Sequence, residues 1–126
     1  MSKSLVDKKA YFFALQIISV YKQLATEKKE FVLSKQLLRS GTAIGALIRE
    51  AEHAQSKKDF LSKMNIALKE ANETVYWLQL IHDSEYIGSS DFEKLLPLIN
   101  ELVKMLAAIV KTTKINLENG ELKMEN

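Results

Sequence analysis

The amino-acid sequence predicts an all-α protein built as a four-helix bundle, and three observations lead to this prediction. Only four glycines and one proline interrupt the 126 residues. Apolar residues recur at steps of three and four, the spacing of one helix face, rather than in the strict alternation of a strand. Four such series follow one another along the chain. At this length we expect one domain, over residues 1–116, with a polar tail at 117–126.

The first helix is expected over residues 5–25 and the second over residues 30–54. A capping box at Ser4 and Asp7 marks the first start, and its apolar series is Ala10, Phe13, Ile17, Val20 and Leu24. The second helix has no capping box, so we place its start near Glu30, after the charged corner at 26–29. Its series is Leu37, Gly41, Ile44, Ile48 and Ala51.

The third helix is expected over residues 57–84 and the fourth over residues 91–115. Capping boxes at 56–59 and 90–93 mark their starts. The third series is Phe60, Met64, Ala67, Ala71, Thr74, Leu78 and Ile81, and the fourth is Phe92, Leu95, Ile99, Leu102, Leu106 and Ile109. Pro97 should kink the beginning of the fourth helix. The tail NLENGELKMEN has little to bury, so we expect it to fray.

Composition narrows the class of protein. With no cysteine there is no disulfide and no thiolate metal site. No signal peptide or apolar run of about 20 residues is evident, so we expect a cytoplasmic protein with no membrane partner. Charge is uneven: residues 1–40 hold eight basic and three acidic groups, net +5, and the remainder ten and thirteen, net −3. The basic part is the N-terminal third.

Two glycines lie inside the second predicted helix, where each costs about 1 kcal/mol relative to alanine. A loop that splits the helix is one reading, but the apolar register runs unbroken across Gly41 and Gly45. A close helix crossing is the physical alternative. Residues 40–48, 11–21 and 105–110 carry no charge, which predicts a homo-oligomer. The expected helix-packing or subunit-interface residues are Gly41, Thr42, Ala43, Gly45, Ala46 and Leu47.

Three short motifs resemble the four helix bundle protein family, also called the 23S ribosomal RNA intervening-sequence proteins. They are Arg-Ser-x-x-x-Ile-Gly at 39–45, Lys-Asp-Phe at 58–60 and Glu-Thr-x-x-Trp-Leu at 73–78. Where the family usually has Asn-Ile-Ala-Glu-Gly, this chain has Leu-Ile-Arg-Glu-Ala at 47–51. The resemblance implies an antiparallel up-down-up-down bundle that assembles into a ring, typically a pentamer. It implies no enzymatic activity, and a related branch of the family binds nucleic acid.

No constellation of residues predicts catalysis. Glu50 and His53 have the Glu-x-x-His spacing of a dinuclear metal site, with Glu70 and Glu73 on the next helix, but a second Glu-x-x-His is absent. We therefore expect solvated helix faces, no metal and no cofactor. Trp77 could stack on a base, although a bundle aromatic at this position is more often core or interface.

Two hypotheses for function remain. In the first, a ring binds RNA or DNA, and its symmetry multiplies a weak basic patch. The candidate nucleic-acid contacts are Lys28, Lys29, Lys35, Arg39 and Arg49. In the second, the ring is a structural or adaptor module for a protein partner, and the same side chains only solvate the outside.

Overall fold

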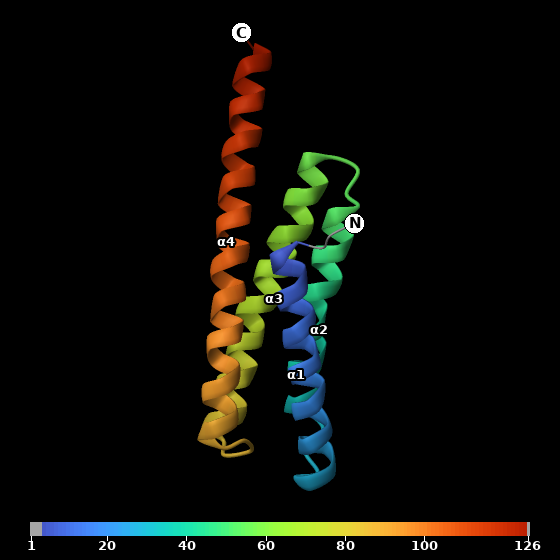
Figure 1. The fold of residues 1–126 in the computed structure, drawn as a ribbon, viewed down its shortest axis with the longest axis vertical. Helices are drawn as coiled ribbons and strands as arrows, with labels where there is room; N and C mark the ends of the chain where they lie inside the picture. Colours follow the sequence, from blue (N-terminus) through green and yellow to red (C-terminus); the bar gives the residue numbers. More distant parts are fainter. Residues whose placement is uncertain (1–3, 126) are drawn as a thin grey trace.

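Four α-helices make up the part of the chain that the structure, a computed structural model, describes. These are residues 4–125, with side chains described for residues 4–121. The helices are α1 (Leu5–Glu27), α2 (Leu33–Glu52), α3 (Lys57–Asp83) and α4 (Ser89–Glu125), and residues 4–125 contain no strand. Figure 1 shows them side by side around a common axis. The prediction of an all-α, four-helix protein is confirmed.

One apolar core joins the helices. Helix α1 contacts α2 and α4, and α3 contacts the same two neighbours. The predicted series supply most of the buried core, because each helix turns its apolar face inward. Phe60, Phe92 and Ile109 are the exceptions among the large members, since they are only partly buried against that core.

The predicted capping serines begin α1 and α3. The N–H of Asp7 donates to Ser4 Oγ at 3.2 Å, and the N–H of Asp59 donates to Ser56 Oγ at 3.0 Å. Helix α4 starts earlier than predicted, at Ser89, so Ser90 lies within its first turn.

Helix α2 begins at Leu33, three residues after the predicted start, because Glu30 caps it. One carboxylate oxygen of Glu30 accepts from the N–H groups of Val32 at 3.0 Å and Leu33 at 2.8 Å, and the other accepts from the N–H of Ser34 at 2.8 Å. Burial raises the pKa of Glu30, but these hydrogen bonds outweigh it and hold the pKa below the usual value. A glutamate thus satisfies the amides that a capping box would serve elsewhere.

Helix α2 runs without a break through both glycines, which excludes the loop reading. A Cβ on Gly41 would lie 3.1 Å from both Cγ atoms of Ile17 on α1. A Cβ on Gly45 would lie 3.7 Å from the Cβ of Ala10, whose backbone carbonyl carbon is 3.8 Å away. Both glycines therefore face α1, and the approach is tighter at Gly41.

Helix α4 continues to Glu125, which corrects the predicted end at 115 and the predicted fraying of residues 117–125. Its C-terminal end reaches beyond the other three helices (Figure 1). Lys58 on α3 lies 3.9 Å from Glu121, and good helix formers fill much of the segment. Helix propensity thus extends the helix where burial does not, with one exposed ion pair beside it. Within residues 4–125, no helix is long and apolar enough to cross a membrane.

Candidate nucleic-acid interface

Arg39 connects α2 to α3 instead of facing solvent alone. Its Nη1 donates to Glu70 at 3.0 Å, and its Nη2 donates to Glu73. Trp77 Nε1 donates to the same Glu73 oxygen at 3.1 Å. The hydrogen bond to Glu73 raises the pKa of Arg39 despite partial burial. The hydrogen bond from Trp77, with that from Arg39, lowers the pKa of Glu73 against the opposing effect of burial.

A second contact between the same helices lies directly beside this network. The buried hydroxyl of Thr74 donates to Ser40 Oγ at 2.9 Å, and Ser40 Oγ donates to the carbonyl of Gln36 at 3.0 Å. Arg39 and Ser40 on α2 thus contact Glu73 and Thr74 on α3, and Trp77 donates to Glu73 from within α3. Two of the motifs that carried the family resemblance therefore form one structural connection between α2 and α3.

Arg49 is also held within the chain. Its Nε donates to the buried carboxylate of Asp7 at 3.3 Å, and its guanidinium lies 5.1 Å from the ring centroid of Tyr11. The other carboxylate oxygen of Asp7 is buried with no hydrogen-bond partner among the described residues. Both candidate arginines thus connect helices within the chain.

The three candidate lysines lie together at one end of the bundle, around the connection between α1 and α2. Lys28 caps the end of α1, Lys29 occupies a turn with φ of 56°, and Lys35 lies in the first turn of α2. All three are exposed, and no acidic group among the described residues lies within ion-pair distance of them. We call Lys28, Lys29 and Lys35 the lysine corner.

Two large apolar residues lie exposed within the same corner. Phe31 is 47% exposed and Val32 is 73% exposed, whereas Glu30 between them and Lys29 is buried. The outer surface of the corner is thus cationic and apolar. Phe31 and Val32 were not among the predicted site residues, although both fall outside the apolar series of the flanking helices and this position marks them in the sequence.

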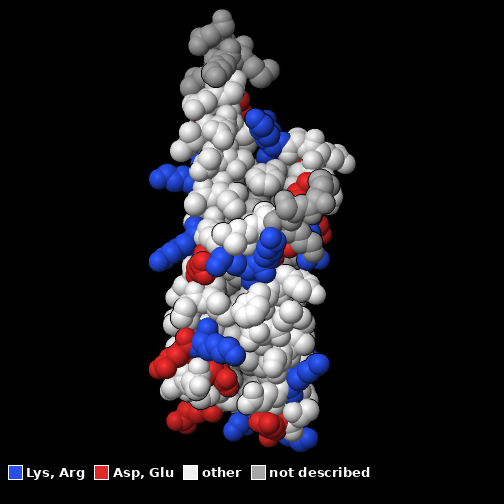
Figure 2. Space-filling model, in the orientation of Figure 1, with Lys and Arg blue, Asp and Glu red and all other residues white. Residues whose placement is uncertain are grey.

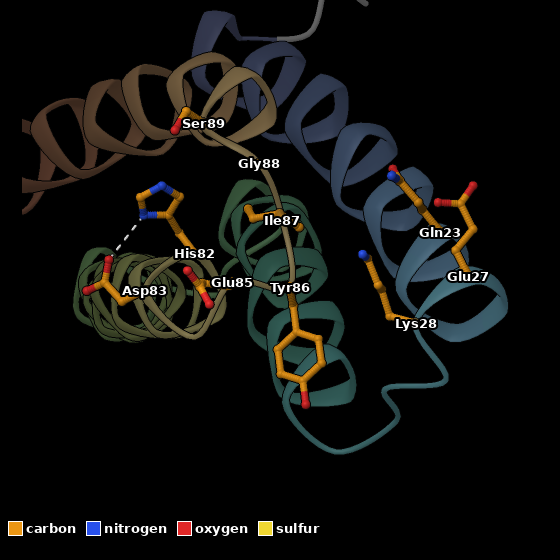
Figure 3. Close-up of a pocket in the computed structure, with 10 residues that line it drawn as sticks. All are labelled: Gln23, Glu27, Lys28, His82, Asp83, Glu85, Tyr86, Ile87, Gly88 and Ser89. Atoms are coloured by element: carbon orange, nitrogen blue, oxygen red, sulfur yellow. Dashed lines mark hydrogen bonds and ion pairs between the residues drawn. The ribbon is translucent and has the colours of Figure 1, made fainter.

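A cleft of about 810 Å³ lies beside the lysine corner, at the same end of the bundle (Figure 3). Side chains from the end of α1, the end of α3 and the connection to α4 line it. Glu27, Asp83 and Glu85 contribute three carboxylates, against the single charged amine of Lys28. His82 in the cleft stacks on Phe92 with ring centroids 4.0 Å apart. This charge balance does not suit a phosphate.

The residues considered for metal binding are dispersed. Glu50 lies 3.7 Å from Lys63, and His53 is exposed. Across residues 4–125, no three His, Cys, Asp or Glu side chains converge as metal ligands would. Trp77 is partly buried against the core.

An apolar face along α1 is exposed in the single chain. Leu5 is 61%, Phe12 49% and Leu15 49% exposed. A groove of about 340 Å³ brings Leu5 and Phe12 next to Leu98 of α4, with Lys9 paired to Glu101 at 2.7 Å on its rim. Figure 2 shows a largely uncharged surface over α1 and α4, interrupted by scattered charges.

The other candidate interface residues lie along α2. Ala46 is exposed, and Thr42, Ala43 and Leu47 are half-buried. The hydroxyl of Thr42 donates to the carbonyl of Leu38 at 2.7 Å, within its own helix. These four residues therefore leave part of the α2 surface open to a partner.

Four helices pack around one core, and a network of arginine, glutamate and tryptophan connects α2 to α3, so the chain is a four-helix protein. The family model for the 23S rRNA-intervening sequence protein matches residues 2–108, and the chain belongs to this family. A crystal structure of a protein of unknown function from the S23 ribosomal protein family, from Bacteroides thetaiotaomicron, is similar to it. The two chains are 54% identical with a TM-score of 0.83, over 85% of this chain and 99% of that chain.

Proposed function

We propose that this protein is a non-enzymatic, cytoplasmic module that assembles with copies of itself and binds structured RNA through the lysine corner. The observation that carries the proposal is the different placement of the candidate cations. Arg39 and Arg49 connect helices, whereas the three lysines lie exposed together at one end of the bundle. Membership of a family described by a ribosomal RNA intervening sequence supports RNA as the polyanion.

Assembly is the second part of the proposal. The exposed side chains of Leu5, Phe12 and Leu15 form an apolar face on α1, and residues 11–21 carry no charge. Such a face is stabilised by burial against another copy. The family resemblance supports a ring of up-down-up-down bundles, a pentamer, as the form of this assembly.

In a ring, symmetry strengthens the effect that the modest charge of three lysines has on RNA affinity. Lysine contacts with phosphates release counterions, but three contacts in a single chain bind weakly at physiological salt. A ring repeats the lysine corner once per subunit, so one RNA that reaches several corners gains avidity without new contacts.

A second candidate function is an adaptor ring for a protein partner, with no role in RNA binding. The carboxylates in the cleft beside the lysine corner favour it, because Glu27, Asp83 and Glu85 reduce the local positive potential. In this case the three lysines are only hydrated surface side chains at the end of the bundle.

A salt titration of RNA binding separates the two functions. An RNA hairpin is titrated with the full chain at several salt concentrations, and the measurement is repeated with all three lysines of the corner changed to glutamine. The matched control changes Lys104, Lys111 and Lys114 to glutamine, since these exposed α4 lysines also have no described ion pair.

We expect the corner variant to bind more weakly and its salt slope to fall by roughly 0.7–0.9 for each lost phosphate contact. The α4 variant should behave like the unmodified chain. No binding at physiological salt, or binding unchanged in the corner variant, would favour the adaptor function instead.

A further inference from the structure

An exposed phenyl ring lies among the lysines of the corner. Phe31 is 47% exposed, and it stands two residues after Lys29 and four before Lys35. A large apolar side chain exposed among cations is unusual in a solvated loop, where small polar residues predominate. Phe31 belongs neither to the buried core nor to the partly buried residues packed against it.

The corner is held in place by its own hydrogen bonds. The N–H groups of Lys28 and Glu30 both donate to the carbonyl of Leu24, at 3.2 and 3.1 Å. The Glu30 carboxylate is turned inward, where it accepts from the N–H groups at the start of α2. The backbone on both sides of Phe31 is thus fixed, and the ring is displayed without a large ordering cost on binding.

We propose that Phe31 is a stacking platform for one unpaired nucleotide, whose neighbouring phosphates contact the lysine corner. This inference rests on the proposed function and deepens it, since it names the form of RNA that the corner recognises. Bases in a duplex are stacked on each other and present no free face, whereas a loop, bulge or single strand does. The corner therefore selects unpaired RNA.

Charge identifies nucleic acid as the occupant in preference to an apolar protein surface. Lys28, Lys29 and Lys35 flank Phe31 and Val32 along the chain. Glu30, the acid next to Phe31, is buried, and the exposed carboxylate of Glu27 lines the neighbouring cleft. An apolar partner would leave these ammonium groups desolvated and unpaired, which is costly. A nucleotide supplies both a flat apolar face and the anions.

The other aromatic residues considered do not offer the same combination. Trp77 donates to Glu73 and is partly buried. Tyr76 lies edge-on to Trp77 with ring centroids 5.1 Å apart. His82 stacks on Phe92 inside the carboxylate-lined cleft.

The test compares two forms of one RNA sequence, about 12 nucleotides long, which is within the range of single-strand sites. Fluorescence anisotropy measures the affinity of the full chain for the single strand and for the blunt duplex. The variants are Phe31→Leu, which keeps an apolar side chain and removes the ring, and Phe31→Trp, which keeps a ring. Tyr76→Leu is the matched control, because Tyr76 is 57% exposed on another helix.

We expect Phe31→Leu to weaken binding of the single strand about tenfold, with the salt slope and duplex binding unchanged, since stacking contributes without a net charge. Phe31→Trp should bind the single strand at least as well as the unmodified chain. Tyr76→Leu should change nothing.

Three results would overturn the inference. If Phe31→Leu bound the single strand as tightly as the unmodified chain, Phe31 would not be a stacking platform. The proposed function would remain intact, provided that the lysine variant still binds more weakly. If the Phe31→Leu variant had a smaller mass than the unmodified chain in light scattering, the phenyl ring of Phe31 would contact a second copy of the chain. Absence of binding by the unmodified chain to either RNA would overturn both the inference and the proposed function.

Discussion

Alanine at Gly41 should destabilise the protein relative to alanine at Gly45, although both replacements remove a glycine from the same helix. Each replacement gains about 1 kcal/mol in helix propensity. The new methyl group meets different surroundings at the two positions, so the difference between the variants isolates packing against α1.

The distances set the expected magnitude. At Gly45 the added Cβ would lie 3.7 Å from the nearest atom, which is ordinary contact, so the propensity gain is kept. At Gly41 it would lie 3.1 Å from two carbons of Ile17, a fully buried side chain that would have to shift within the core. Such overpacking costs about 1–3 kcal/mol, which is also the expected difference between the two variants.

Urea unfolding of both variants, at equal chain concentration because assembly couples stability to concentration, measures this difference. A thermal melt should show Gly45→Ala above the unmodified protein and Gly41→Ala below Gly45→Ala, at about 4 °C for each kcal/mol. The reasoning would be refuted if Gly41→Ala were the more stable variant.

Glu30→Ala should lower the free energy of unfolding by about 1–2 kcal/mol in urea, since it leaves the first amides of α2 without an acceptor; an unchanged midpoint would contradict this. Because the pKa of Glu73 is lowered in the folded chain, its contribution is present at neutral pH and is lost as pH falls below the ordinary value of 4.5. Acid unfolding of Glu73→Gln should therefore show a weaker pH dependence, and an identical pH profile would exclude this role. Phe12→Lys should dissociate the assembly in light scattering while Ile66→Lys, on α3, leaves the mass unchanged; the opposite result would place the interface elsewhere.

The helices could be predicted from the sequence because each one buries a single face. The series through Phe13 and Ile17, or through Leu102 and Leu106, repeats at helical spacing, and the structure buries these side chains almost completely. Capping of α1 by Ser4 and of α3 by Ser56 was also predictable, since each serine accepts from an N–H group three residues further along the chain.

Contacts that depend on the relative position of two helices were beyond such reasoning. The sequence offers Glu50 or Glu73 as a partner for Arg39, but the choice of Glu73 together with Glu70 depends on how α2 and α3 align, which a periodic pattern does not specify. The cap by Glu30 was not predicted because Glu30 precedes the first residue of α2 by three positions and no serine capping box is present there. The full length of α4 was not predicted because helix propensity, rather than burial of an apolar face, extends its C-terminal part.

The central claim, that an assembled form of this chain carries RNA on its lysine corner, is tested most directly by sedimentation of a fluorescent RNA hairpin with the protein at about 0.15 M salt. One experiment then reports both assembly and binding. We predict that the RNA sediments with a species of several chains, and that the variant with Lys28, Lys29 and Lys35 changed to glutamine forms the same species without RNA. A single-chain species, RNA that sediments alone, or a variant that carries RNA as well as the unmodified protein would contradict the account.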